Sequence, residues 1–377
     1  MRNILAYAVV AFVGATVTLL VNRPARTIAL RVGYTALPDE RKVHQTATPY
    51  GGGAAMLIGF CVALAVSNVI PELRMVIASS HEMFGVVVAS GVIFVVGVVD
   101  DFREMSAPAK VAGQFLAASV LYFSGATMYQ LKLPFAGFVV LGPSILPVIT
   151  AVWVFAISNA INLIDGLDGL AGGIVAIASG TLCIYGLRLE DLGLLPVTNV
   201  GPLIAALTFG VCVGFLRDNF YPAKLFMGDA GALMLGLLMS ASTMVIGGRT
   251  PPASGVTFFF FAPLLIPVFI LGVPLVDATW AFVRRTASGQ GFHTPDKNHI
   301  HHRLMRLGHG HRRTVIILWL WTALLCGFVL FPLFEPRVNV FIPFGVALLV
   351  IGLITWFSPL LARWTGRVEP RVDEPVR

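Results

Sequence analysis

The stretch NAINLIDGLDGLAGG, residues 159–173, places polar side chains at the boundary between two apolar runs. It contains the amides of Asn159 and Asn162 and the carboxylates of Asp165 and Asp168, at three-residue intervals. On a helix end, this spacing puts the four side chains on one side. Acids beside a membrane-spanning segment indicate a functional site, because an ionised carboxylate is costly in hydrocarbon. The amide and carboxylate oxygens are ligands that suit Mg2+, and the glycines allow the backbone to approach a phosphate closely. The alternative is that these residues only cap a helix and form a tight turn.

The composition around this stretch is that of an integral membrane protein. The chain has 377 residues, of which 57% are hydrophobic and 12% are charged. Apolar runs long enough to cross a bilayer recur throughout, so we predict a single membrane domain, residues 1–377, with no soluble domain appended. The four cysteines are scattered in apolar runs without metal-ligand spacing, which indicates buried free thiols.

Eleven such runs predict an all-α polytopic fold with about eleven transmembrane helices. They cover residues 3–21, 51–70, 83–99, 110–126, 143–161, 169–187, 199–216, 230–247, 256–283, 314–333 and 339–362. The first run resembles a signal peptide but lacks a convincing small-residue cleavage site, so it is kept as a span. The ninth run contains Pro263, Pro267 and Pro274 and is long for one crossing, which predicts a kinked or broken helix.

The basic residues predict the orientation of these spans. Of the 26 Lys and Arg residues, 20 fall on one side of the predicted spans and 6 on the other. The positive-inside rule then places the N-terminus outside and the C-terminal tail, residues 363–377, in the cytoplasm. The membrane is expected to be the plasma or inner membrane of the cell. The polar loops 37–53, 100–110, 159–173, 217–232 and 284–313 all fall on the cytoplasmic side. The net charge of +7 therefore indicates orientation and anionic substrates rather than nucleic acid.

An acidic pair and a lysine flank the third predicted span. Asp100 and Asp101 end it in the sequence VVDDF, and Lys110 opens the next span. Adjacent carboxylates at a membrane boundary repel each other, which favours cation binding or one raised pKa. Lys110 is expected to offset this charge or to hold a phosphate. The alternative is a capping pair with a snorkelling lysine.

A further acid begins the eighth predicted span in the sequence FMGDAGA, residues 226–232. Asp229 occupies an N-terminal helix position, where the backbone also favours anions, so helix capping is a strong alternative to a ligand role. Phe226 has a flat face on which a base can stack, although an aromatic side chain at a membrane interface needs no ligand.

The last cytoplasmic loop, residues 284–313, holds six of the eight histidines. Its segment DKNHIHHRL contains the side chains of His299, His301, His302 and Arg303. A cationic cradle for pyrophosphate is the favoured interpretation. A transition-metal site and a basic loop that binds lipid headgroups are the alternatives. The first loop, 37–53, carries the basic sequence PDERKVH, which by itself indicates a solvated positive-inside loop.

Taken together, these motifs resemble the polyprenyl-phosphate N-acetylhexosamine-1-phosphate transferase family. PDERKVH, VVDDF, NAINLIDGLDGL, FMGDAGA and HIHHRL occur in the order of that family and span residues 38–304. The first and last are more similar to the branch that uses UDP-N-acetylglucosamine than to the branch that uses the muramyl-pentapeptide nucleotide. Ala230 and Ala232 depart from the pattern, since many members carry a hydroxyl residue there, so any hydrogen bond from those positions is missing.

The resemblance implies that a membrane polyprenyl phosphate (undecaprenyl or decaprenyl) attacks the sugar-linked phosphorus of a UDP-sugar and releases UMP. It implies that Mg2+, with Mn2+ as a substitute, is held by Asp229 and Asn162. The implied catalytic residues are Asp100, Asp101, Lys110, Asp165 and Asp168. The implied substrate-binding residues are Asn159, Asn162, Phe226, His299, His301, His302 and Arg303, with Phe226 on the uracil.

Other functions remain open at this point. The same reaction with another UDP-hexosamine is one, and a secondary transporter of an anionic solute is another. Transporter sites lie near the bilayer midplane between repeats, whereas the acids here gather at one predicted face and the motifs show no repeat. A structural or lipid-binding scaffold does not require acids and amides in matched loops. A homodimer is compatible with the sequence but is not indicated by it.

Overall fold

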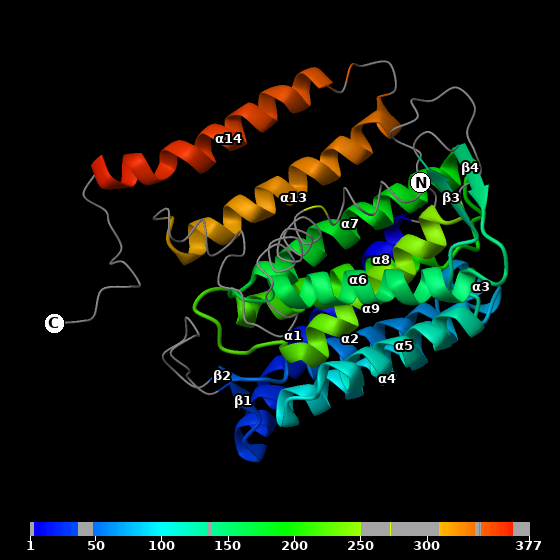
Figure 1. The fold of residues 1–377 in the computed structure, drawn as a ribbon, viewed down its shortest axis with the longest axis horizontal. Helices are drawn as coiled ribbons and strands as arrows, with labels where there is room; N and C mark the ends of the chain where they lie inside the picture. The colour runs from blue at the N-terminus through cyan, green and yellow to red at the C-terminus, as the bar shows by residue number, and fades with distance from the viewer. Residues whose placement is uncertain are drawn as a thin grey trace.

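A computed structural model describes residues 4–36, 48–133, 137–249, 309–335 and 341–364, together with the single positions 272 and 339. Most of this part is helical, and the helices lie alongside one another in a bundle (Figure 1). The helices are α1 (Ile4–Val32), α2 (Gly52–Ser67), α3 (Pro71–Ala78), α4 (Glu82–Arg103), α5 (Ala107–Phe123), α6 (Leu146–Ile164), α7 (Leu170–Asp191), α8 (Gly201–Asn219), α9 (Gly228–Gly247), α13 (His311–Phe334) and α14 (Phe341–Trp364).

Ten of the eleven predicted spans overlap one of these helices. Seven helices are long and apolar enough to cross a membrane, namely α1, α4, α6, α7, α8, α9 and α13, and an eighth span results if α2 and α3 together form one. These helices make the chain a polytopic membrane protein. The count of eleven and the orientation stay predictions. The ninth predicted span, 256–283, and its kink lie outside the described residues.

The second predicted span, 51–70, is not a straight helix. Helix α2 ends at Ser67, and α3 then runs at an angle of 106° to α2. Pro71 begins α3, and the residue before it, Ile70, is extended with φ −87° and ψ 115°. Proline disfavours helical geometry in the preceding residue, so the chain turns between the two helices.

Two short antiparallel hairpins also depart from the all-α expectation. β1 (Thr35–Ala36) pairs with β2 (Thr48–Pro49), and β3 (Gln130–Leu133) pairs with β4 (Gly137–Val140). Strands of two to four residues are too short for an alternating pattern to be recognised in a sequence. The β1–β2 pair brings Thr35 and Ala36, just after α1, beside Thr48 and Pro49, just before α2, which matters for the site.

Helix α9 forms the centre of the bundle, where α4, α6 and α8 pack against it (Figure 1). Every residue of α9 except Asp229 is buried. A helix that is apolar all round is expected to be enclosed by others. Small residues allow close approach: a Cβ on Gly97 of α4 would collide with the backbone of Ala230. All four cysteines are free, as predicted, but Cys61 is exposed rather than buried.

The helices alternate in direction, so one end of the bundle collects the polar stretches. The C-terminal ends of α4, α6 and α8 meet there with the N-terminal ends of α5, α7 and α9, at the left in Figure 1. We call this region the polar end, defined by residues 100–110, 159–173 and 217–232. The opposite end carries β3, β4 and α3 (Figure 1).

Candidate active site at the polar end

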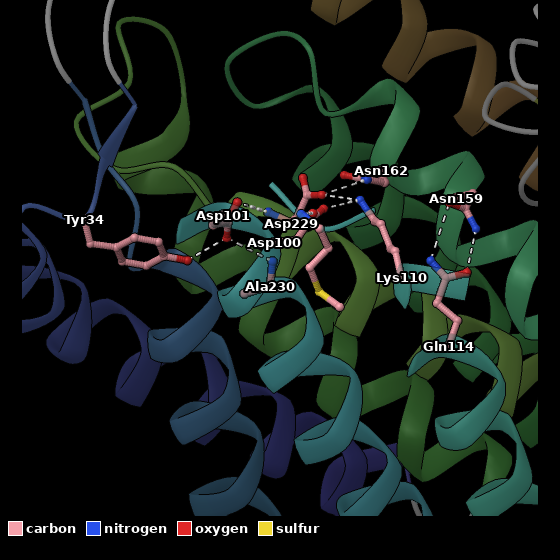
Figure 2. Close-up of polar contacts among 10 residues, drawn as sticks. Tyr34, Asp100, Asp101, Lys110, Gln114, Asn159, Asn162, Asp229 and Ala230 are labelled. Atoms are coloured by element: carbon pink, nitrogen blue, oxygen red, sulfur yellow. Dashed lines mark hydrogen bonds and ion pairs between the residues drawn. The ribbon is translucent and has the colours of Figure 1, made fainter. Parts of the chain in front are cut away.

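Lys110, in the first turn of α5, lies at the centre of the polar end (Figure 2). Its ammonium group contacts Asp100 Oδ2 at 2.7 Å and also contacts Asp229 Oδ2. The three side chains are only 13–30% exposed. Two carboxylates from different helices, α4 and α9, therefore share one cation in a place where charges are poorly screened by water.

Asn162, in the last turn of α6, completes this cluster. With its amide oriented to satisfy both neighbours, it donates to Asp229 Oδ1 at 3.1 Å and accepts from Lys110 Nζ at 3.2 Å. Four helices thus each contribute one side chain to a single contact group (Figure 2). We call the group formed by Asp100, Lys110, Asn162 and Asp229 the central cluster. The sequence analysis placed all four residues among its candidates, and it paired Lys110 with the acidic pair and Asn162 with Asp229, but it did not predict that all four form one contact group.

Asp101 has different surroundings from its neighbour Asp100. Its Oδ1 accepts from the backbone N–H of Asp229 at 2.9 Å, and its Oδ2 accepts from that of Ala230 at 3.3 Å and from the Tyr34 hydroxyl at 2.6 Å (Figure 2). Side chains of successive residues on a helix point about 100° apart, so Asp100 and Asp101 point toward different neighbours. Asp101 satisfies backbone donors at the start of α9 that no helical carbonyl can reach.

The turn before α9 leaves room for Asp101. Gly228 has φ +68°, and a Cβ at this position would lie 2.5 Å from Asp101 Oδ2. Glycine is the residue that adopts positive φ without strain and adds no side-chain atoms. The glycine of the FMGDAGA motif therefore permits the close approach of α4 to the N-terminus of α9.

Asp165 and Asp168 lie beyond the end of α6 at Ile164, so the four polar residues of the stretch do not share one helix face as expected. Burial raises the pKa of the Asp165 carboxyl well above its usual value, and the carboxylates of Asp229, Asp101 and Asp168 act in the same direction. Asp168 is 3% exposed and accepts from the backbone N–H of Ala223 at 2.8 Å. Asp168 thereby braces the loop between α8 and α9.

Asn159 faces α5 rather than the central cluster. It donates to Gln114 Oε1 at 2.8 Å and to the carbonyl of Phe155 at 2.7 Å, and the Gln114 amide donates back at 3.5 Å. Gln114 is 1% exposed and lies one helical turn from Lys110 (Figure 2). Sequence reasoning missed Gln114, although one amide inside the apolar run 110–126 was a usable signal.

Phe226 lies in the turn before α9, partly buried. Its backbone N–H donates to the Pro49 carbonyl at 3.0 Å, and its own carbonyl accepts from Gly52 at 2.9 Å. Its ring lies 6.3 Å from that of Tyr50, tilted by 48°. The backbone of Phe226 thus joins the end of the first polar loop, at Pro49 and Gly52, to the start of α9.

The basic loop before α13 is seen only at its end. His299, His301, His302 and Arg303 lie outside the described residues. In the last residues of the predicted loop, which the structure places at the start of α13, the His311 ring stacks on Tyr221 at 4.5 Å, and Arg312 donates to the Tyr221 carbonyl at 3.2 Å. The loop therefore returns to the bundle at the turn between α8 and α9, at the polar end.

The donor atoms of the central cluster suit a hard cation. Carboxylate and amide oxygens are what Mg2+ prefers, and it is commonly held by one or two carboxylates plus substrate phosphates. Within the described ranges, no three His, Cys, Asp or Glu side chains gather closely enough to hold a metal ion by themselves. The oxygen atoms of Asp229 and Asn162 therefore fit a Mg2+ ion that also binds a phosphate ligand.

Comparison with known proteins places these residues in context. Residues 83–247 match the model of glycosyl transferase family 4, a range that contains the whole central cluster. The chain is 37% identical over 373 residues to the decaprenyl-phosphate N-acetylglucosaminephosphotransferase of Mycobacterium tuberculosis, covering 97% of this chain and 92% of the relative. It is 34% identical over 365 residues to the probable undecaprenyl-phosphate N-acetylglucosaminyl 1-phosphate transferase of Bacillus subtilis, covering 96% and 93%. The undecaprenyl-phosphate alpha-N-acetylglucosaminyl 1-phosphate transferase of Escherichia coli K12 is 27% identical over 361 residues, covering 92% and 90%.

Proposed function

This chain belongs to glycosyl transferase family 4, and we propose that it transfers N-acetylglucosamine 1-phosphate from UDP-N-acetylglucosamine to a membrane polyprenyl phosphate. The products are UMP and a polyprenyl-pyrophosphoryl N-acetylglucosamine. The observation that carries this proposal is the identity of 37% to a relative of that activity along 97% of this chain. The central cluster supplies a place in which the chemistry can occur.

The reaction forms one phosphorus–oxygen bond and breaks another. An oxygen of the lipid phosphate attacks the sugar-linked phosphorus of the donor, and the bond from that phosphorus to the oxygen shared with the UMP phosphate breaks. The electron pair leaves with UMP, while the bond between the sugar and its phosphate stays intact. A phosphate monoester has its second pKa near 6, so the attacking group is already ionised at neutral pH and needs no general base. We therefore favour direct in-line attack over a covalent aspartyl-phosphate intermediate.

The chain's own residues align the phosphates and balance their charge, which is most of what phosphoryl transfer requires. Lys110 is held between Asp100 and Asp229, and its ammonium is proposed to bind a phosphate oxygen. The Asn162 amide contacts both Lys110 and Asp229 and is proposed to hold the two side chains in place. Mg2+ held by Asp229 and Asn162 would neutralise charge on the donor pyrophosphate.

The remaining predicted residues are proposed to surround this centre. Phe226, partly buried beside α9, is proposed to stack on the uracil. His299, His301, His302 and Arg303 are proposed to bind phosphate or sugar. We propose that the polar end faces the cytoplasm, because the excess of Lys and Arg lies on that side of the predicted spans.

The test is UMP release by purified protein in detergent, given UDP-N-acetylglucosamine, polyprenyl phosphate and Mg2+. We expect release that requires both the lipid and the metal, so omission of the lipid or addition of EDTA abolishes it. Release with a different UDP-hexosamine alone would assign another donor to the same mechanism. Absence of release with every UDP-hexosamine, in folded protein, would contradict the proposed function.

A further inference from the structure

Tyr34 is a tyrosine outside the sequence motifs whose hydroxyl reaches the site. It follows α1 and precedes β1, and its O–H donates to Asp101 Oδ2 at 2.6 Å (Figure 2). The same carboxylate accepts from the backbone N–H groups of Asp229 and Ala230. A continuous set of hydrogen bonds therefore runs from the segment after α1, through α4, to the first turn of α9.

The Tyr34 side chain is held firmly by its neighbours. Its ring stacks on Phe102 with centroids 4.4 Å apart and planes 12° apart, and it lies 5.3 Å from the ring of Tyr50. Its carbonyl accepts from the N–H of Tyr50 at 3.0 Å. Burial raises the pKa of Tyr34, as does its hydrogen bond to Asp101, so the hydroxyl keeps its proton and remains a donor at neutral pH.

A second connection reaches the start of α9 from the same segment. Beyond Tyr50, the N–H of Gly51 and that of Gly52 donate to the carbonyl of Phe226, and that of Gly53 donates to the carbonyl of Met227 at 3.2 Å. The backbone just before Asp229 is thus attached to residues 49–53. The backbone at Asp229 itself is attached to Asp101, and Tyr34 contacts both of these supports.

We propose that Tyr34 is a positioning residue, which by holding Asp101 against the N-terminus of α9 fixes the direction of the Asp229 carboxylate toward Lys110 and Asn162. This inference rests on the proposed function, since it assigns Asp229 to the reacting site. It also separates the acidic pair: Asp100 contacts Lys110 directly, whereas Asp101 acts through the backbone of α9. A misplacement of about 1 Å in a catalytic group is enough to lower turnover strongly.

The test replaces only the hydroxyl. Tyr34→Phe keeps the ring that stacks on Phe102 and removes the donor to Asp101. We expect the amides of Asp229 and Ala230 to exchange with deuterium about tenfold faster, because the carboxylate that accepts from them is less restrained. We expect kcat to fall about tenfold while KM for the donor changes less than about twofold. Tyr129→Phe is the matched control, since it removes a hydroxyl that bonds the Gly125 carbonyl at the opposite end.

A double-mutant cycle tests the route through Asp101. In an Asp101→Asn background, we expect Tyr34→Phe to lower kcat by less than about twofold, because the two residues act in one chain of contacts. A full tenfold loss in that background, or unchanged amide exchange in Tyr34→Phe alone, would overturn the proposal. Amide exchange needs no substrate. A wild-type protein without transferase activity would therefore refute the proposed function, while the exchange data would still decide the role of Tyr34.

Discussion

Lys110 balances two carboxylates that come from separate helices, and this arrangement dominates the site at the scale of single residues. Asp100 and Asp229 each lie within an ion-pair distance of its ammonium. Without that cation, two like charges would face each other in a partly buried place. The sequence identified all three residues as candidates, because an acid or a lysine at a membrane boundary is unusual. It could not predict which partner each of Asp100 and Asp101 has, because that depends on how α4 is rotated against α9.

We expect Lys110→Gln to lower turnover at least about 100-fold, because the fixed cation that we propose meets phosphate is lost. It should also lower the free energy of unfolding by about 2 kcal/mol, since two carboxylates lose their shared partner. Activity assays and thermal unfolding measure the two effects. Adding Asp100→Asn should restore part of the stability and none of the activity. Unchanged stability in Lys110→Gln would contradict the assigned charge balance.

Asp229→Asn tests the acid at the start of α9. The variant keeps the shape of the side chain and the backbone groups that Asp101 caps, so the protein should stay folded. Turnover should fall at least about 100-fold, because the proposed carboxylate ligand for Mg2+ is lost. Asp218→Asn is a suitable control at the same end of the bundle, since Asp218 accepts from Asn22 rather than joining the cluster. Normal turnover in Asp229→Asn would exclude Asp229 from the metal site.

The raised pKa of the Asp165 carboxyl predicts that the stability of the metal-free protein depends on pH. Burial and three nearby carboxylates raise the pKa of Asp165 in the folded state, so the folded protein holds this proton more tightly than the unfolded chain does. Its contribution to stability is therefore fully present below the unfolded pKa of about 4 and is lost as pH rises through the raised folded value. Thermal unfolding in EDTA measures this decline, which should be shallower in Asp165→Asn. An identical pH profile for the two proteins would contradict the assigned shift.

At the scale of elements, α5 and α6 are joined by an amide pair within their apolar lengths. Gln114 and Asn159 exchange hydrogen bonds, with Lys110 and Asn162 one turn farther toward the polar end. We infer that the pair sets the register of the two helices and thereby lets Lys110 contact Asn162. Helix positions were predictable from apolar runs, but this pairing was not, because an isolated glutamine does not reveal its partner. The bend between α2 and α3 was missed for a local reason, the effect of Pro71 on Ile70.

We expect Gln114→Leu to reduce both stability and turnover moderately. The amide of Asn159 loses its partner on α5, and such a loss in a membrane interior costs about 1 kcal/mol. Register between α5 and α6 is then less well determined, so kcat should fall about fivefold. The double variant Gln114→Leu with Asn159→Leu should regain stability, since no unpaired amide remains. If Gln114→Leu alone had wild-type stability and turnover, the pair would have no role in register.

At the scale of the whole molecule, alternation of helix direction gathers polar loops that lie far apart in the sequence. The order of the predicted spans indicated this gathering, because an odd or even number of crossings decides on which side each loop falls. The contacts of Asp229 with Lys110 and Asn162 show how closely three of these loops meet. The sequence could not show that α9, rather than another apolar helix, lies at the centre, since its apolar content resembles that of the peripheral helices.

The central claim is that the phosphate attached to the sugar moves to the lipid while UMP leaves. It is tested most directly with UDP-N-acetylglucosamine that carries a radioactive label on the phosphate next to the sugar. We predict that the label enters the lipid product, that the released nucleotide is unlabelled UMP, and that Asp229→Asn abolishes the transfer. Label recovered in UDP, with the sugar alone on the lipid, would contradict this account.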